Sequence, residues 1–230
     1  MKIFFPAAIF FLACVAAAAG TITGAVRAEG KTIPADGSSG DAYASRKWKF
    51  VQTNDYSAMH DFVVFIEGPV GTNYAASTNV TQVATMRVAQ QGAVFSPHVL
   101  PVMVGTKVEW PNYDNIYHNV FSISDAKQFD LGLYKGNPQE KAQTFDKPGR
   151  VDVFCSIHTD MHCIVLVLEN PYFAATDERG RYSITNVPPG TYKLKAWHER
   201  LPPDEREIIV PANGEVRADF VLGIKNLPEY

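Results

Sequence analysis

The sequence predicts an all-β protein. Short runs rich in valine, isoleucine, phenylalanine and tyrosine recur along the 230 residues, and 15 prolines and 16 glycines are scattered among them. Runs of this kind are typical of strands bounded by turns, and they argue against a helical bundle. Hydrophobic residues make up 46% of the chain and charged residues 20%, which is ordinary for a globular protein.

The first nineteen residues have the pattern of a secretory signal. Lys2 precedes an apolar run over Ile3–Val15, and four alanines then lead to Gly20. The run is shorter than the roughly 20 apolar residues that cross a bilayer, so cleavage after Ala19 is favoured over a retained anchor. An imperfect lipoprotein box that ends at Cys14 leaves acylation as an alternative. We therefore expect a periplasmic or extracellular protein.

Residues 20–82 contain the first predicted strands. Gly20–Val26 alternates apolar with small or polar residues, and Phe62–Ile66 is a short continuous apolar run typical of a buried strand. Between them, Arg46–Gln52 is a candidate exposed strand, and Gly68–Gly71 punctuates the end of this section.

A second series of strands fills residues 83–170. Its members are Ala84–Ala89, Val99–Val104, Thr106–Trp110, His118–Ile123, Ala142–Phe145, Arg150–Cys155 and Cys163–Leu168. Seven short strands with turns between them indicate a sandwich or a barrel. No segment beyond the signal is apolar enough to span a membrane.

Residues 171–230 form a third section. The predicted strands are Arg181–Ile184, Thr191–Trp197, Glu207–Val210 and Val216–Leu222. The predicted turns are Asp177–Gly180, Pro188–Gly190, Leu201–Pro203 and Asn213–Gly214. Proline presets φ and glycine supplies positive φ, which gives these turns a physical basis.

The charge balance excludes one class of partner. Lys and Arg number 21 against 24 Asp and Glu, for a formal net charge of −3. No basic surplus exists to neutralise a phosphate backbone, so we do not expect nucleic acid to bind.

One loop concentrates metal-ligating side chains. Cys155, His158 and Met161 lie within seven residues at the end of a predicted strand, and His118 begins another strand 37 residues upstream of Cys155. Two imidazoles, a thiolate and a weak thioether form the soft trigonal set with a long axial bond that suits copper.

The motifs around these residues resemble those of the cupredoxins, the blue-copper family of plastocyanin and amicyanin. The upstream motif is Val108–Asn112 followed by Tyr117–Val120, and the downstream motif runs from Pro148 through Met161. The resemblance covers roughly Ala84–Leu168, and it implies a Greek-key sandwich that holds one mononuclear copper ion.

That resemblance also assigns roles to residues. It implies that the copper ligands are His118, Cys155, His158 and Met161. It places Asn119 beside the thiolate, where a hydrogen bond would tie the two ligand loops together and tune the metal.

The ligand loop departs from the amicyanin pattern in several places. Ile157 and Thr159 flank His158 where amicyanin-like loops carry proline, and Asp160 adds a charge. His162 and Cys163 follow Met161 directly. Asp160, His162 and Cys163 therefore stay open as alternative metal ligands.

Two other interpretations of this loop remain. Cys155 and Cys163 would lie nearly opposite each other on a hairpin, close enough for a cross-strand disulfide. Alternatively, Cys155, His158, His162 and Cys163 form a four-ligand set of the zinc type. The disulfide leaves His118, Asn119 and Met161 unexplained, and the zinc set would have to draw all four ligands from nine residues.

The third section resembles the carboxypeptidase regulatory-like domain, a small β-sandwich. The motifs are Ala175–Asp177, Gly180–Ile184 and Val187–Tyr192. Such domains usually begin with strands like Gly20–Gly24 and Phe62–Phe65, so we expect the cupredoxin to be inserted into a split sandwich. The alternative is that the amino-terminal strands extend the cupredoxin.

This organisation divides the chain into a signal (1–19), an amino-terminal β segment (20–82), a cupredoxin domain (83–170) and a regulatory-like sandwich (171–230). The expected function is that of an exported type 1 copper protein, not an enzyme, which carries single electrons between a redox donor and acceptor such as a cytochrome or a dehydrogenase. Copper(I) delivery without redox cycling and a red-copper catalytic site are the alternatives.

Overall fold

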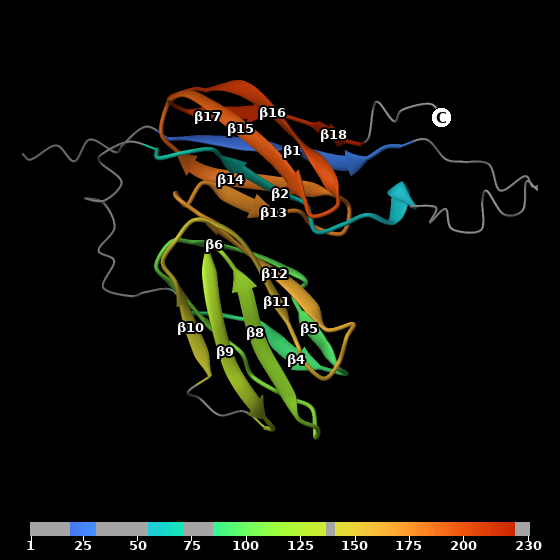
Figure 1. Ribbon diagram of the computed structural model, residues 1–230. Coiled ribbons are helices and arrows are strands. Elements are labelled where there is room, and N and C mark those ends of the chain that lie inside the picture. Colours follow the sequence, from blue (N-terminus) through green and yellow to red (C-terminus); the bar gives the residue numbers. More distant parts are fainter. Residues whose placement is uncertain (1–18, 31–54, 71–84, 137–140, 224–230) are drawn as a thin grey trace, which may run out of the picture.

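The computed structural model describes residues 19–30, 55–70, 85–136 and 141–223, which form two lobes (Figure 1). Within these residues the only helical element is a 3-10 turn, η1 (Tyr56–Ala58), and everything else regular is strand. The prediction of an all-β protein is therefore confirmed. The predicted strand Arg46–Gln52 and residues 1–18 of the predicted signal lie outside the described residues. Among the described residues, no helix has the length and hydropathy of a membrane span.

The lower lobe contains three sheets. A five-stranded sheet has the order β6-β12-β11-β8-β9, a three-stranded sheet has the order β10-β7-β3, and β4 pairs with β5. The strands are β3 (Thr85–Arg87), β4 (Ala89–Gln91), β5 (Val94–Ser96), β6 (Val99–Met103), β7 (Thr106–Glu109), β8 (His118–Ser124), β9 (Lys127–Tyr134), β10 (Ala142–Phe145), β11 (Gly149–Phe154) and β12 (His162–Leu168).

The upper lobe combines strands from both ends of the described chain, as the blue and red ribbons of Figure 1 show. One sheet has the order β14-β1-β17 with β18 also paired to β1, and the other has the order β13-β2-β15-β16. The strands are β1 (Gly20–Ala28), β2 (Val63–Ile66), β13 (Phe173–Ala175), β14 (Arg181–Val187), β15 (Gly190–His198), β16 (Leu201–Val210), β17 (Gly214–Arg217) and β18 (Phe220–Leu222).

Each lobe has its own hydrophobic core. Trp110, Phe95 and Phe145 are among the largest fully buried side chains of the lower lobe, and Phe62 and Phe220 are among those of the upper lobe. Burial of each such ring removes a large apolar area from water, which supplies the main stabilisation of a β-sandwich.

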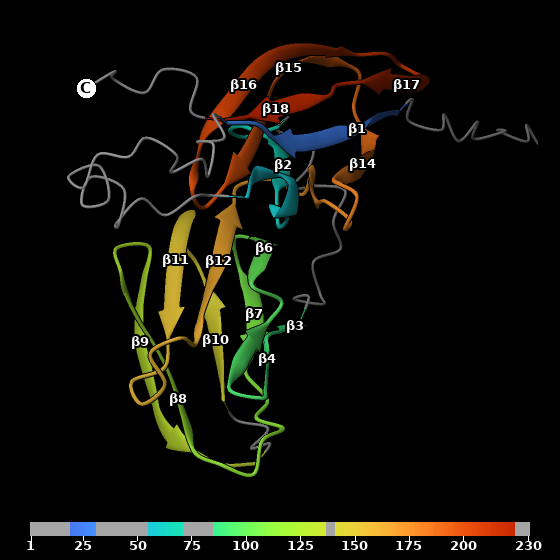
Figure 2. The same cartoon turned by 90° about the vertical axis from the view of Figure 1, so that its right-hand side faces the viewer.

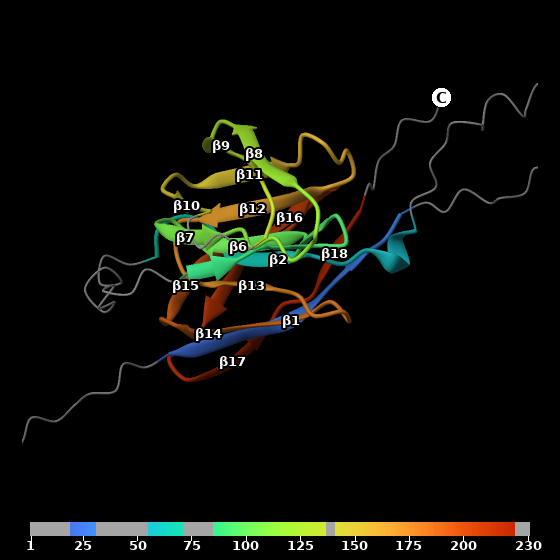
Figure 3. The ribbon, with the colours of Figure 1, turned by 90° about the horizontal axis from the view of Figure 1, so that it is seen from below.

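Strand β12 belongs to two cores at once. Its side chains alternate between faces, and Cys163, Val165 and Val167 pack into the lower-lobe core. The opposite face forms a separate junction cluster with Val63 of β2 and Val99 of β6; its β12 members are Ile164, Leu166 and Leu168. Figure 2 shows β12 rising toward the upper lobe, and Figure 3 shows β12 and β6 close to β2 and β13. The two lobes therefore share an apolar contact along this strand.

A buried asparagine fixes the point where the chain passes between lobes. The Asn170 amide nitrogen donates to the carbonyl oxygens of Ile66 and Gly68, each at 2.7 Å. Its side-chain oxygen accepts from the backbone N–H of Tyr172 at 2.9 Å. These bonds hold β2 and β13 together in antiparallel register, with Phe65 opposite Phe173.

The strand predictions were wrong at several places. β16 begins at Leu201, so the predicted turn over Leu201–Pro203 is instead strand. β16 is an edge strand, where proline can be accommodated because it need not donate to a neighbour. Strands β5, β9 and β13 were not predicted, and two predicted strands, Ala84–Ala89 and Val216–Leu222, each correspond to a pair of strands, β3 with β4 and β17 with β18.

Candidate metal centre

The ligand loop connects β11 to β12 and is closed by its own backbone. The Cys155 N–H donates to the Met161 carbonyl at 3.2 Å, and the Met161 N–H donates to the His158 carbonyl at 3.1 Å. These bonds hold Cys155 and Met161 opposite each other where the two strands separate. Both side chains are buried in the lower-lobe core, with exposures of 6% and 1%.

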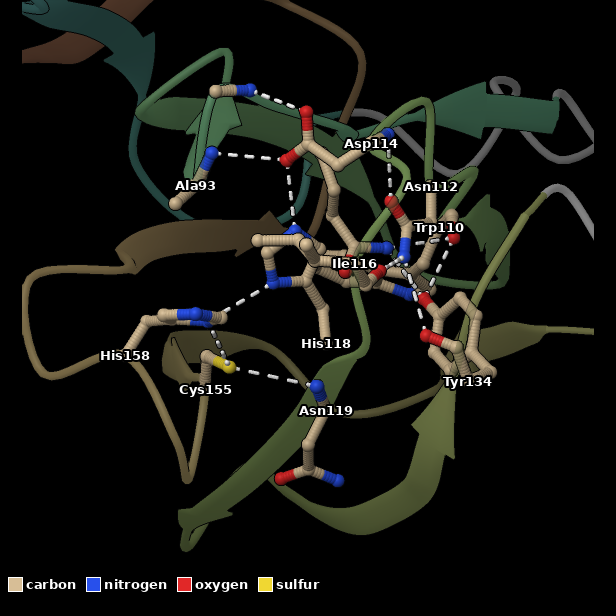
Figure 4. A network of polar contacts seen from close by, with 12 residues as sticks. Ala93, Trp110, Asn112, Asp114, Ile116, His118, Asn119, Tyr134, Cys155 and His158 are labelled. Carbon is tan, nitrogen blue, oxygen red and sulfur yellow. Dashed lines mark hydrogen bonds and ion pairs between the residues drawn. The ribbon is translucent and has the colours of Figure 1, made fainter.

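His118 is brought to this loop by sheet pairing. It is the first residue of β8, which pairs with β11, and its side chain is fully buried. Its Nδ1 atom lies 3.1 Å from Nδ1 of His158, and Sγ of Cys155 lies 3.6 Å from that same His158 atom. One ligand atom from each of the three residues lies within 4.8 Å of the others. Figure 4 shows the three side chains pointing toward one another.

Asp114 orients the His118 ring. Its carboxylate lies 2.8 Å from His118 Nε2, so that nitrogen carries the proton and the Nδ1 lone pair faces the cluster. The same carboxylate accepts the backbone N–H groups of Gly92 and Ala93 at 2.7 and 2.9 Å. Those two N–H groups, Ala93 first, together with His118, hold the pKa of Asp114 below its ordinary value. Asp114 is therefore a fixed negative charge behind the ring.

Asn112 shapes the loop that presents Asp114. Its side-chain oxygen accepts the Asp114 N–H at 2.9 Å, and its amide donates to the carbonyls of Ile116 and Tyr134 at 3.0 and 3.2 Å. The loop between β7 and β8 is thus tied to β9 just before it delivers His118 (Figure 4).

Asn119 contacts the thiol through its backbone. Its N–H donates to Sγ of Cys155 at 3.4 Å, while its side-chain amide donates to Asp130 of β9 at 2.7 Å. An N–H directed at a thiolate sulfur stabilises the negative charge there. The side chain, by contrast, braces the β8–β9 hairpin.

The alternative ligands named from sequence lie elsewhere. Asp160 is exposed, and His162 Nε2 lies 2.9 Å from Asp152, on the far side of β12 from Met161. Cys163 is fully buried opposite Val153, and burial raises the pKa of its thiol. β11 and β12 pair in a register that leaves both cysteines as free thiols, not the disulfide. The four residues of the zinc-type set are not brought together either, because His162 lies beside Asp152 and is grouped with His98 and Glu199, apart from Cys155 and His158.

The donor set fits a copper ion. A thiol and two imidazole nitrogens meet at one buried point, which is the soft set that copper prefers over hard cations. The orienting carboxylate on His118 is the partner that metal-bound imidazoles commonly have. Asp114 escaped the sequence analysis; its place four residues before His118 was the only local signal.

Such a site in a β-sandwich defines a copper-binding domain of cupredoxin type, and comparison with known families confirms this resemblance. Residues 82–168 match the family model of copper binding proteins, plastocyanin/azurin family, and residues 165–223 match the carboxypeptidase regulatory-like domain. The match, with the His118, Cys155 and His158 group, indicates one copper ion as the cofactor.

Similar solved structures are also cupredoxins or copper enzymes. A copper-containing nitrite reductase from Thermus scotoductus SA-01 is 28% identical, with a TM-score of 0.37 over 45% of this chain and 28% of that one. A purple cupredoxin from Nitrosopumilus maritimus is 26% identical, with a TM-score of 0.31 over 36% of this chain and 98% of that one. A reduced copper(I) form of an amicyanin variant is 24% identical, with a TM-score of 0.33 over 45% and 97%. No curated protein sequence matches this chain significantly.

Proposed function

We propose that this protein is a type 1 (blue) copper protein that carries single electrons between redox partners. The observation that carries the proposal is the convergence of His118, Cys155 and His158 at one point, with Met161 buried in the core that also contains Cys155. In this proposal these four residues bind one copper ion, with Met161 as the weak axial ligand.

The role of the chain is to hold one geometry for both oxidation states. Copper supplies a centre that alternates between its +1 and +2 states when it is bound. His118 begins a strand of the five-stranded sheet, and the ligand loop is closed at its base by the bond from Cys155 to Met161. Ligands supported by strands on both sides move little, which keeps the reorganisation that accompanies electron transfer small.

His158 offers the route for electrons. It is the only half-buried member of the three; His118 and Cys155 are buried. Exposed apolar side chains stand in the two ligand-bearing loops, at 47–58% exposure: Tyr113, Ile116, Tyr117 and Ile157. We propose that a redox protein, such as a cytochrome or a dehydrogenase, docks on this apolar face, and that the chain itself turns over no substrate.

The proposed location is the periplasm or the outside of the cell. It rests on the signal pattern in residues 1–19, with acylation at Cys14 as the alternative. Such compartments are oxidising, so the Cys155 thiol stays available to copper only if no second cysteine forms a disulfide with it. The pairing of Cys163 with Val153 keeps the two thiols apart.

Burial of the ligands supports electron transfer over copper(I) delivery. A delivery site must release its ion, whereas His118, Cys155 and Met161 are each no more than 6% exposed. A red-copper catalytic site would need Asp160 or His162 in place of Met161, but Asp160 is exposed, and His162 lies with His98 and Glu199, apart from the group of His118, Cys155 and His158. Both observations favour the electron carrier.

The test is the visible absorption and electron paramagnetic resonance spectrum of the copper-loaded chain. We expect an intense thiolate-to-copper band with narrow hyperfine splitting, which Cys155→Ser abolishes and Met161→Ala shifts. Cys163→Ala is the matched control, because it removes the other buried thiol of the lower lobe and should keep the band.

Two results would overturn the proposal. A folded, copper-saturated sample without the band would exclude a type 1 site. A site that yields its copper readily to chelators and does not cycle reversibly would indicate copper(I) delivery instead.

A further inference from the structure

Three metal-ligating side chains meet at a second place, on the junction between the lobes. His98 precedes β6, His162 begins β12, and Glu199 lies in the turn between β15 and β16. One ligand atom from each lies within 4.8 Å of the others. Their side chains are 35%, 25% and 19% exposed, so all three are partly buried and still reachable by an ion from solvent.

The His98 ring faces an acceptor on each side. Its Nδ1 lies 3.2 Å from the carbonyl oxygen of His162, and its Nε2 lies 3.1 Å from Oε1 of Glu199. A neutral imidazole has one N–H and can donate to only one of them. When Nδ1 donates to the His162 carbonyl, Nε2 keeps a lone pair that faces the Glu199 carboxylate, and a cation can bind between these two donor atoms.

His162 is held in one orientation. Its Nε2 lies 2.9 Å from a carboxylate oxygen of Asp152. The Arg150 guanidinium donates a hydrogen bond to each oxygen of that carboxylate, at 2.7 and 2.8 Å. The Phe154 ring stacks on the His162 ring, with centroids 4.8 Å apart. A carboxylate on one ring nitrogen fixes the tautomer and leaves a lone pair on the other, which is how metal-binding imidazoles are commonly supported.

We propose that His98, His162 and Glu199 bind a divalent cation of the zinc class. Two imidazoles and one carboxylate form an established zinc ligand set, whereas calcium and magnesium take all-oxygen sites and copper(I) prefers sulfur. The 3.1 Å between His98 Nε2 and Glu199 Oε1 is close to the roughly 3.3 Å that separates neighbouring ligands around tetrahedral zinc with bonds of about 2.0–2.1 Å.

Such an ion would connect the two lobes. Glu199 belongs to the upper lobe, while His98 and His162 belong to the lower lobe. His162 directly follows Met161, so an ion bound there also anchors the end of the copper loop. The site would therefore fix the orientation of the lower lobe, which is the copper domain, on the upper lobe, which serves as its scaffold.

The experiment is a calorimetric titration of the copper-loaded full chain with Zn²⁺ alone, followed by desalting and metal counting. We expect one zinc per chain in addition to one copper. Glu199→Gln keeps the shape and an acceptor for His98 but removes the charge, and His98→Asn removes a ligand. Each should weaken zinc binding at least tenfold, since even outer partners of metal ligands cost about 10- to 100-fold.

The matched control is His60→Gln. His60 Nδ1 lies 2.7 Å from Asp61, so it forms a histidine–carboxylate pair without a place in the three-residue group. Its loss should leave zinc binding unchanged. The copper spectrum, recorded throughout, verifies that each variant is folded and that zinc has not displaced copper. Absence of zinc in the wild-type chain, or equal zinc affinity in all four proteins, would overturn the proposal. His98, His162 and Glu199 would then only form contacts between the two lobes.

Discussion

Asp114 illustrates how much a single side chain contributes to the candidate metal centre. Its carboxylate receives three N–H groups, two from the β4–β5 turn and one from His118. Those bonds keep it ionised, as its lowered pKa indicates. Asp114 therefore fixes the tautomer of His118 and also places a negative charge next to it, which favours copper(II) over copper(I).

The variant Asp114→Asn tests both effects. We expect copper(II) affinity to fall by about 10- to 100-fold. We also expect the reduction potential to rise, by about 59 mV for each tenfold loss that is confined to copper(II). Voltammetry and competitive copper titration measure the two quantities.

Asp125→Asn is the control for Asp114→Asn, because Asp125 is an exposed carboxylate of the same lobe in the β8–β9 turn. Equal potentials in the two variants would show that Asp114 acts only as one of many distant charges.

Sequence spacing was informative where the residues are neighbours. Cys155, His158 and Met161 share one loop, so their proximity could be predicted from the chain alone. The roles of Asp114 and Glu199 depend on turns that the fold brings in from other strands. For Asp114 the only local signal is its place four residues before His118, and for Glu199 the contact with His98 joins residues 101 positions apart.

At the scale of elements, the strands that were missed have weak local signals. β9 alternates between exposed and half-buried residues along most of its length, so it lacks the apolar run of a buried strand. Pro202 and Pro203 near the start of β16 are typical of a turn, yet an edge strand can accommodate proline. The strongly apolar strands, β2 and β12, were predicted to within one residue at each end.

The absence of a side chain at Gly180 allows β1 to pack closely against the turn before β14. Its φ is +74°, and its carbonyl accepts the Val26 N–H at 2.8 Å. A Cβ atom at Gly180 would overlap the backbone oxygen of Val26. Gly68 has a similar φ of +78° but open space around it.

The variants Gly180→Ala and Gly68→Ala separate two contributions to the free energy of unfolding. One is the cost of a left-handed backbone at a residue other than glycine, and the other is the cost of the overlap with Val26. Gly68→Ala should lose about 1–2 kcal/mol of unfolding free energy for its left-handed conformation. Gly180→Ala should lose about 1–3 kcal/mol more, because β1 must move. Urea denaturation followed by circular dichroism gives both values. Equal losses would mean that β1 does not pack against this turn.

Acid should weaken the sheet of β2, β15 and β16 through its charges. Glu67 and Glu205 both contact Lys193 and Lys195, and these lysines, Lys193 first, lower the pKa of each carboxyl. Their folded pKa values lie below the unfolded value of about 4.3. The stabilisation is therefore present above that pH and is lost as pH falls through the folded values.

Thermal unfolding of the wild type and Glu67→Gln from pH 7 to pH 3 tests this. Tm should differ by a few degrees at most at pH 7, because exposed pairs are screened, and the difference should vanish near pH 3. If the Tm difference between the two proteins stays constant over this pH range, it arises from side-chain packing and not from the charge of Glu67.

At the scale of the molecule, we propose that the copper domain, residues 83–170, is inserted at a hairpin of the scaffold. β2 and β13 are antiparallel neighbours, so the chain leaves and re-enters the upper lobe at adjacent points. β1, which lies far from β14 and β17 in sequence, stands between them in the sheet. The regulatory-like match begins only at residue 165, so β1 and β2 lie outside it.

A deletion tests the insertion. Replacement of residues 71–169 by a short glycine-serine turn should leave a scaffold that unfolds cooperatively, because its core cluster is complete without the lower lobe. Calorimetry and circular dichroism provide the measurement.

The companion variant also removes β1, and it should not fold, since β14 and β17 then lose their common neighbour. A scaffold that folds equally well without β1 would contradict the insertion.

The two-faced burial of β12 limits how portable the copper domain is. The two family matches overlap at residues 165–168, within this strand. A copper domain transplanted to another host would carry an apolar strip of Val99, Ile164, Leu166 and Leu168 into water, and such strips promote self-association. An engineer who moves the domain must therefore supply a new apolar cover or exchange the outward side chains for polar ones.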